Sequence, residues 1–270
     1  MSYVNANELY EALEQCFEPD RYTELFPQIG LQYHNTDRIE RIYTATFASI
    51  PVLRSILDKN TKNSLLFTHH PVPPKPNEDG NYGVIPQDLL EEMQDKKLTL
   101  FSYHIAMDCN NKYSPARTLA KALGMQPYAP FYPQNGGYIG VLCHTERTST
   151  VTGISAALQR VLGHEVKVYG FGEDALTSKN VAVMPGGAKN RDIYAFLRQQ
   201  NINVFITGVT NENISWVKET HDKAREYGVN ILGGTHYSTE KFAPMAMAEF
   251  FDQFGLQTEF IPDLPNLADL

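Results

Sequence analysis

The chain has 270 residues, with 31 acidic and 23 basic side chains and a formal net charge of -8. This balance, without a dense run of Lys and Arg, argues against a nucleic-acid-binding protein that works by neutralising phosphates. It does not exclude an anionic small molecule as substrate, because a bound metal ion can dominate the field inside a cleft. The length is sufficient for one large domain or two modest ones with real cores.

The three cysteines are widely spaced and include no Cys-x-x-Cys pair, so they indicate neither a zinc ribbon nor a disulfide framework. The first eight residues lack the basic and apolar regions of a signal peptide. No apolar stretch is long enough to span a membrane. The sequence therefore predicts a cytoplasmic protein with no membrane partner.

In chain order, the first predicted element is an amphipathic helix at residues 7–17, where Leu9, Leu13 and Phe17 recur at helical spacing. Strands are predicted at residues 39–47, 64–68, 98–103, 138–143, 166–169, 181–184, 204–207 and 230–232. Further helices are predicted at residues 52–57, 86–94, 115–123, 151–162, 193–199 and 216–227. The alternation of strands and helices predicts an α/β protein with mixed sheets.

Proline and glycine mark the breaks between these elements. A Pro-rich stretch at residues 71–80 predicts a long loop after a histidine pair. Ser114 is a suitable N-cap for the helix at residues 115–123, and Gly124 suits the left-handed residue after its end. Prolines and glycines concentrate again at residues 127–137, where we expect a linker and a domain boundary.

Three apolar segments of the chain end in side chains that bind metals. The three groups are the pair His69-His70, His104 with Asp108, and His236 with Glu240. Open α/β sheets bind ligands at the carboxyl ends of their strands, so distant segments can meet there. Five or six nitrogen and oxygen ligands with no thiolate suit two ions such as zinc, manganese or iron, with one carboxylate bridging.

Each group also has a simpler explanation when it is taken alone. His104 with Asp108 is compatible with a half-buried histidine beside a solvated carboxylate. Glu240 falls near the first turn of a helix expected at residues 241–250, whose dipole stabilises a carboxylate without any metal. Gly186-Gly187 either forms a backbone nest for phosphate or a tight strand-to-helix turn, and we favour the turn. Lys241 is either a phosphate partner or a solvated helix residue, and we favour the latter.

The segments around the three groups resemble the signature motifs of the Nif-three-like family of dinuclear metal-centre proteins, often described as GTP cyclohydrolase I type 2. The motifs are Thr-His-His-Pro at 68–71, Ser-Tyr-His-Ile-Ala-Met-Asp at 102–108 and Gly-Thr-His-Tyr-Ser-Thr-Glu-Lys at 234–241. Gly-Leu-Gln at 30–32, the glycine-rich turn at 183–188 and Phe-Ile-Thr-Gly at 205–208 are similar to further family motifs. The resemblance covers nearly the whole chain.

This resemblance implies a domain organisation and a ligand set. Residues 1–125 and 228–270 would form the metal-binding domain, and residues 126–227 a second α/β domain inserted between them. The metal ligands would be His69, His70, Asp108, His236 and Glu240, with Glu240 as the bridge. His104 would be a further ligand, a general acid/base or a supporting group. The cofactors would be two divalent ions per chain, zinc, manganese or iron, in a ring-shaped homohexamer with the metal sites facing its interior cavity.

Two functions follow from this set of residues together with the resemblance, which alone implies a nucleotide as substrate. The first is a metal-dependent hydrolase in which metal-activated water attacks a nucleotide or similar small molecule, with His104 as the catalytic proton shuttle. The second is a non-catalytic metal-binding, metal-buffering or regulatory scaffold protein. Phe47 and Val209 favour the second, because they stand where the family commonly has acidic residues. The segment before Gly30 also lacks the usual Asp-Asn pair.

Overall fold

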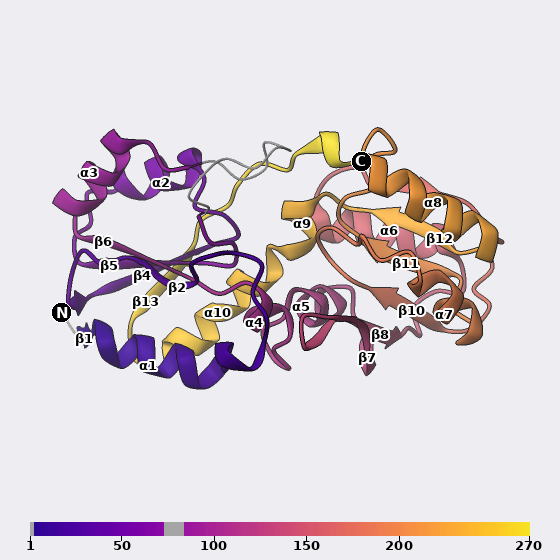
Figure 1. The fold of residues 1–270 in the computed structure, drawn as a ribbon, viewed down its shortest axis with the longest axis horizontal. Helices are drawn as coiled ribbons and strands as arrows, with labels where there is room; N and C mark the ends of the chain where they lie inside the picture. The colour runs from indigo at the N-terminus through magenta and orange to yellow at the C-terminus, as the bar shows by residue number, and fades with distance from the viewer. Residues whose placement is uncertain (1–2, 73–83) are drawn as a thin grey trace. The chain divides into compact units, whose positions relative to one another are not determined.

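The computed structural model describes residues 3–72 and 84–270, in two compact units (Figure 1). Unit 1 comprises Met1–Tyr113 and Ala243–Asp263, and unit 2 comprises Ser114–Phe242 and Leu264–Leu270. The long loop expected at residues 71–80 lies almost wholly outside the described residues. Both units have a mixed sheet covered by helices, which confirms the predicted α/β class.

Unit 1 contains a five-stranded sheet in the order β13-β4-β5-β6-β2. Its strands are β13 (Gln257–Phe260), β4 (Arg41–Ala45), β5 (Ser64–Thr68), β6 (Leu98–Ser102) and β2 (Gly30–Tyr33). The first four are parallel, and β2 is an antiparallel edge strand. Every residue of β5 and β6 is buried, as expected for central parallel strands covered on both faces. A separate short ladder joins β1 (Val4–Asn5) to β3 (Arg38–Ile39).

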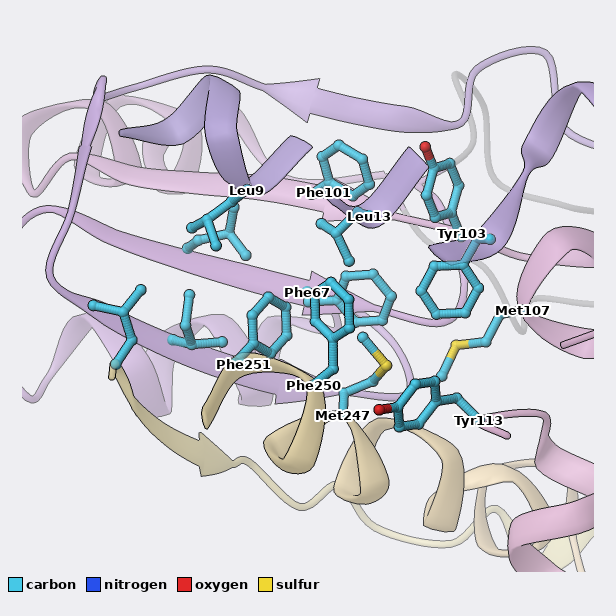
Figure 2. Close-up of a cluster of buried hydrophobic side chains, with 14 of the residues drawn as sticks. Leu9, Leu13, Phe67, Phe101, Tyr103, Met107, Tyr113, Met247, Phe250 and Phe251 are labelled. Carbon is cyan, nitrogen blue, oxygen red and sulfur yellow. The ribbon is translucent and has the colours of Figure 1, made fainter. Parts of the chain in front are cut away.

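Four helices cover the two faces of this sheet. They are α1 (Ala6–Phe17) and α10 (Phe242–Asp252) on one face, and α2 (Ile50–Leu57) and α3 (Gln87–Asp95) on the other (Figure 1). Leu9, Leu13 and Phe17 of α1 are fully or almost fully buried, as their helical spacing predicts. Figure 2 shows these α1 leucines beside aromatic side chains of β5, β6 and α10, among them Phe67, Phe101 and Phe251. Burial of each such side chain contributes about 1.5–3 kcal/mol.

Unit 2 contains a six-stranded sheet in the order β7-β8-β10-β11-β12-β9. Its strands are β7 (Gln126–Gln134), β8 (Gly137–His144), β10 (Asn180–Val183), β11 (Val204–Thr207), β12 (Asn230–Gly233) and β9 (Lys167–Tyr169). The central strands β10, β11 and β12 are parallel to one another. Their flanking neighbours β8 and β9 are antiparallel to them. The carboxyl ends of the three central strands therefore lie at one edge of this sheet.

The Pro- and Gly-rich segment expected as a linker forms the β7–β8 hairpin instead. Asn135 and Gly136 have φ values of 52° and 88° at the turn, and two positive φ values are what a tight hairpin turn requires. Prolines 127, 130 and 133 are tolerated because β7 is an edge strand and needs fewer donors. A linker and a proline-rich edge hairpin can thus have the same amino-acid composition.

Helices cover both faces of the second sheet. They are α5 (Pro115–Ala122), α6 (Val151–Leu162), α7 (Ile193–Gln199) and α8 (Ser215–Tyr227). Val204 and Ile206 of β11 share a core with α5 and α6, whereas Phe205 between them contacts Tyr194 of α7. Ser114 caps α5 by accepting a hydrogen bond from the backbone of Arg117, as predicted. Within residues 3–72 and 84–270, none of the helices has the length and apolarity needed to cross a membrane.

The division between the units differs from the boundaries expected at residues 125 and 228. Helix α5 falls in unit 2 because its apolar face packs with α6 and the central strands. Strand β12 also falls in unit 2, because it pairs with β11 and β9. The C-terminal residues Leu264–Leu270 return to unit 2, whereas α10 and β13 belong, apart from Phe242, to unit 1.

Candidate metal centre

In unit 1, the sheet register brings two groups of candidate ligands to one edge. Thr68 and Ser102, the last residues of β5 and β6, are direct partners in the parallel ladder. Their hydroxyl oxygens lie 2.6 Å apart, and Thr68 also donates to the carbonyl oxygen of His70 at 2.9 Å. Whatever follows these two strand ends therefore lies close together. His69 and His70 follow β5.

His104 follows β6 and joins His69 and His70 in one buried cluster. One ring nitrogen of each histidine lies within 4.8 Å of those of the other two. Asp108 is the last residue of the short helix α4 (Ile105–Asp108). One of its carboxylate oxygens lies 3.4 Å from His69 Nε2, and the other lies 3.9 Å from His104 Nε2. These four side chains form the unit 1 ligand group.

The hydrogen-bond partners of two of these rings define which nitrogen faces the group. His69 Nδ1 lies 3.3 Å from the backbone oxygen of Tyr103, which only accepts, so Nδ1 carries the proton. His104 Nδ1 lies 2.9 Å from Glu24 Oε1, which is likewise an acceptor when ionised. In the neutral form of both rings, Nε2 then carries the lone pair, on the side of Asp108. A histidine that donates its other ring nitrogen to an oxygen is the usual arrangement of a metal ligand.

Glu24 is a functional candidate that the sequence analysis missed. Its second oxygen accepts a hydrogen bond of 3.0 Å from the backbone nitrogen of Ile105. Burial raises the pKa of the Glu24 carboxyl, but the hydrogen bonds from His104, Ile105 and Leu25 outweigh burial and lower the pKa below its ordinary value. Glu24 is 80 residues from His104 in an irregular segment. No motif or periodicity pointed to it.

Aromatic rings flank two of the unit 1 histidines. Phe47 is stacked on His70, with ring centroids 4.4 Å apart and an interplanar angle of 6°. Phe26 meets His104 edge to face at 4.9 Å. Phe47 stands at one of the positions where the resemblance led us to expect an acidic residue. In this chain the position supplies a flat apolar surface against a candidate ligand.

In unit 2, His236 and Glu240 lie on the short helix α9 (His236–Glu240), directly after β12. Their i, i+4 spacing places them on one side of the helix, and His236 Nε2 lies 3.2 Å from Glu240 Oε2. The Glu240 side chain is only 6% exposed. These two residues form the unit 2 ligand pair.

A strained residue and a distant carboxylate hold the start of α9. Thr235 has φ 62° and ψ 152°, a region that residues with a side chain rarely occupy. Its hydroxyl and carbonyl accept hydrogen bonds from Ser238 and Thr239. The backbone nitrogen of His236 donates to Asp269 Oδ2 at 2.9 Å. Burial is the main cause that raises the pKa of the Asp269 carboxyl. Asp269 is the second residue that the sequence analysis missed.

Gly186 packs directly against the unit 2 ligand pair. It has φ +69°, and a Cβ at this position would lie 2.3 Å from Glu240 Oε1 and 3.2 Å from His236 Nε2. Its backbone nitrogen donates to the Thr239 hydroxyl at 3.2 Å. Its carbonyl accepts from the backbone nitrogens of Gly208 and Val209. The N–H of Gly186 is therefore used within the fold, which favours the tight-turn interpretation over a phosphate nest.

Lys241 differs from the solvated residue that we expected. Its ammonium donates to the carbonyl oxygen of Leu162 at 2.8 Å, at the C-terminal end of α6. Unpaired carbonyls and the negative end of the helix dipole make this position favourable for a cation. Burial lowers the pKa of Lys241. Lys241 thus connects the C-terminal end of α9 to α6 through this hydrogen bond.

Comparison with known proteins places these residues in a family. The family model Duf34/NIF3 (NGG1p interacting factor 3) matches residues 4–265. The chain belongs to this family. A relative from Borreliella burgdorferi named GTP cyclohydrolase 1 type 2 homolog is 26% identical over 278 residues, covering 98% of this chain and 100% of the relative. This confirms the family that the motifs indicated.

Two solved structures share the fold of this chain. The protein ybgI, described as of unknown function, superposes with a TM-score of 0.78 at 19% identity, covering 97% of this chain and 99% of that one. A protein from Thermus thermophilus superposes with a TM-score of 0.76 at 20% identity, covering 98% of this chain and 100% of that one. At these identities the likeness supports the fold alone.

Proposed function

We propose that this Duf34/NIF3 protein binds two divalent metal ions with five ligands, among which Glu240 is the bridge. The ligands are His69, His70, Asp108, His236 and Glu240. The observation that carries the proposal is the buried trio of unit 1, in which ring nitrogens of His69, His70 and His104 lie within 4.8 Å of one another. The assignment of all five residues as ligands is supported by the three family motifs, which occur here in order.

The donor atoms of both groups fit such ions. Imidazole nitrogens and carboxylate oxygens without a thiolate suit zinc, manganese or iron(II). His69 and His104 present Nε2 because Nδ1 of each is held by an oxygen acceptor. In unit 2, the absence of a Cβ at Gly186 leaves room beside Glu240 Oε1 that any other residue would fill.

We further propose that the protein is a metal-dependent hydrolase of a nucleotide or similar small molecule. Relatives named GTP cyclohydrolase 1 type 2 homolog support this class of substrate. Two bound ions would supply a water molecule of lowered pKa and a Lewis-acidic site. His104 would hold and release a proton at Nε2, with Glu24 accepting at Nδ1. The half-buried aromatic rings of Phe47 and Phe26 would keep water away from the histidines they contact.

The second candidate is a metal-buffering or regulatory scaffold without a dedicated substrate. Phe47 favours it, because an apolar ring covers His70 where the family commonly has an acidic residue. Val209 favours it as well, because it is buried and carries no polar group toward a substrate. In either role we propose the homohexameric ring that the resemblance implies, which sedimentation velocity of the purified protein would test.

The decisive experiment is the metal-to-chain ratio of purified protein by plasma mass spectrometry. We expect about two ions per chain, and fewer in both His69→Ala and Glu240→Ala. His144→Ala is the matched control, because His144 is a half-exposed histidine bonded to Asn180 and Glu146 outside the motifs. Loss of metal in His69→Ala alone would restrict the site to unit 1. A wild-type protein that takes up no zinc, manganese or iron would overturn the proposal.

A turnover assay then separates the two candidate functions. A hydrolase should release formate from GTP, or product from a related nucleotide, with saturable kinetics that vanish on chelation. His104→Ala should slow turnover while metal stays bound, if the residue exchanges protons. A buffer should instead exchange ions freely and show no saturable turnover with any nucleotide.

A further inference from the structure

We propose that Glu24 is a positioning residue of the metal centre, which fixes both the orientation of His104 and the helix that carries Asp108. This inference deepens the proposed function and rests on it for the role of the two residues. The geometry itself belongs to unit 1 and does not depend on a bound metal.

The contacts of Glu24 use both oxygens of its carboxylate. Oε1 accepts from His104 Nδ1 at 2.9 Å, and Oε2 accepts from the backbone nitrogen of Ile105 at 3.0 Å. Glu24 and His104 side chains are each only 12% exposed, so water competes weakly for these bonds. Charge-assisted hydrogen bonds of this length are the strong ones in proteins.

The first bond fixes the tautomer of His104. With the proton held on Nδ1, the lone pair lies on Nε2, which is the nitrogen 3.9 Å from Asp108 Oδ2. The opposite tautomer would leave Nδ1 without a proton to donate and place two acceptors face to face. Glu24 therefore selects the form of His104 that either binds a metal or accepts a proton at Nε2.

The second bond caps a helix. Ile105 is the first residue of α4, and His104 at the N-cap makes no side-chain capping bond. Helix starts leave backbone N–H groups unsatisfied, and Glu24 supplies the acceptor from a distant segment. Asp108 closes the same helix, so the carboxylate that orients His104 also anchors the element on which Asp108 lies.

Only a carboxylate satisfies both donors. A glutamine at this position has one acceptor oxygen and one NH2 group, which would face either His104 Nδ1–H or the Ile105 N–H. Glu24→Gln thus keeps the size of the side chain and removes one of the two bonds. Glu24→Ala removes both. Glu18→Gln is the matched control, because Glu18 lies in the same part of the chain, is exposed and pairs with Arg21.

The first measurement needs no metal. Long-range 1H–15N spectra of histidine-labelled, metal-free protein report which ring nitrogen carries the proton, and His104→Gln assigns the His104 signals. We expect a protonated Nδ1 and a bare Nε2 in wild type and in Glu18→Gln. In Glu24→Gln and Glu24→Ala we expect the His104 pattern to shift toward mixed tautomers. An unchanged pattern in both Glu24 variants would overturn the inference.

The second measurement is zinc affinity by competition with a chromophoric chelator. We expect Glu24→Ala to bind zinc about 10- to 100-fold more weakly, because Glu24 anchors the helix that carries the ligand Asp108. Glu24→Gln should lose less, and Glu18→Gln should match wild type. If the wild type binds no zinc while the tautomer still shifts, the proposed function fails and the positioning role stands. If the wild type binds zinc and neither readout changes in the Glu24 variants, the inference fails alone.

Discussion

The two units hold their candidate ligands in different ways. In unit 1, four side chains come from two parallel strand ends and one short helix, and three histidine nitrogens already lie within 4.8 Å of one another. In unit 2, two side chains one helical turn apart are held between a strained Thr235 and Gly186, where a Cβ would clash with Glu240. The first group can hold an ion by itself. The second offers only two ligands and depends on backbone packing to present them.

This difference indicates where each group is vulnerable. Unit 1 spreads its ligands over several elements, so its main sensitivity is to the partners that orient the rings. Unit 2 concentrates its ligands on α9, so a backbone change next to that helix should disable both ligands at once. Three predictions test this contrast, in order of decreasing effect.

The largest effect is expected for Gly186→Ala. The new Cβ would lie 2.3 Å from Glu240 Oε1 on a residue with φ +69°, so both contact and conformation oppose it. We expect a loss of about 2–4 kcal/mol in the free energy of unfolding. Urea unfolding measures this loss, and plasma mass spectrometry should show less bound metal.

Gly163→Ala separates the two causes in the preceding prediction. Gly163 also lies in unit 2 with φ +83°, but a Cβ there would meet no atom within 4 Å. Its substitution should cost only the conformational part, about 1–2 kcal/mol, and leave metal content unchanged. Equal losses at the two glycines would show that the contact with His236 and Glu240 does not matter.

A smaller effect is expected for Phe47→Leu in unit 1. The substitution keeps an apolar side chain and removes the stacking on His70, which is worth about 0.5–1.5 kcal/mol beyond area. Thermal unfolding measures the cost, and zinc competition should show a changed affinity because His70 loses its support. Phe196→Leu in unit 2 is the control, since Phe196 stacks on Phe131 without touching a candidate ligand. A change in zinc affinity in the control as well would remove the assignment to His70.

The candidate ligands were predictable because each group of them follows the end of a strand. In the sequence, the end of a buried strand can be recognised as the end of an apolar run. The pairing of the strands then determines where these residues lie. Because β5 and β6 are parallel neighbours, His69, His70 and His104 lie at one edge of the sheet. Glu24 and Asp269 were not predictable in this way. Each carboxylate lies in a segment without periodicity and accepts a hydrogen bond from a distant backbone N–H, 81 and 33 residues away respectively. Such contacts depend on tertiary packing alone.

The domain organisation shows the same limit. Prolines and glycines at residues 127–137 have the composition of a linker, yet Asn135-Gly136 is also a hairpin-turn pair. Composition alone did not separate the two. Strand pairing distinguishes the hairpin from a linker, since β7 and β8 pair with each other in the sheet of unit 2. The caps of α5, by contrast, depend on local chemistry, and Ser114 and Gly124 were predicted correctly.

The smallest expected effect concerns the pH dependence of the unfolding free energy. It should differ between Glu24, which supports the unit 1 ligand group, and Asp269, which supports the unit 2 ligand pair. The pKa of Glu24 is lowered because hydrogen bonds from His104, Ile105 and Leu25 outweigh burial. As the pH falls, the carboxyl of Glu24 therefore becomes protonated in the unfolded chain before it does so in the folded chain. Its contribution to stability is present above the ordinary carboxyl pKa and is lost as the pH falls through the lowered value. The pKa of Asp269 is raised chiefly by burial, so the folded chain takes up the proton first. Its contribution is present at low pH and is lost as the pH rises through the raised value.

Stability curves of metal-free protein between about pH 3 and pH 7 test these opposite signs. Glu24→Gln should flatten the rise in unfolding free energy with increasing pH, because the group that prefers to be ionised in the fold is gone. Asp269→Asn should steepen that rise, because it removes the group that opposes it. The two curves should therefore deviate from wild type in opposite directions. If both stability curves deviated from wild type with the same sign, one of the two carboxylates would not make the contacts described here. The variant whose curve has the unexpected sign would identify that carboxylate and the ligand group that it supports.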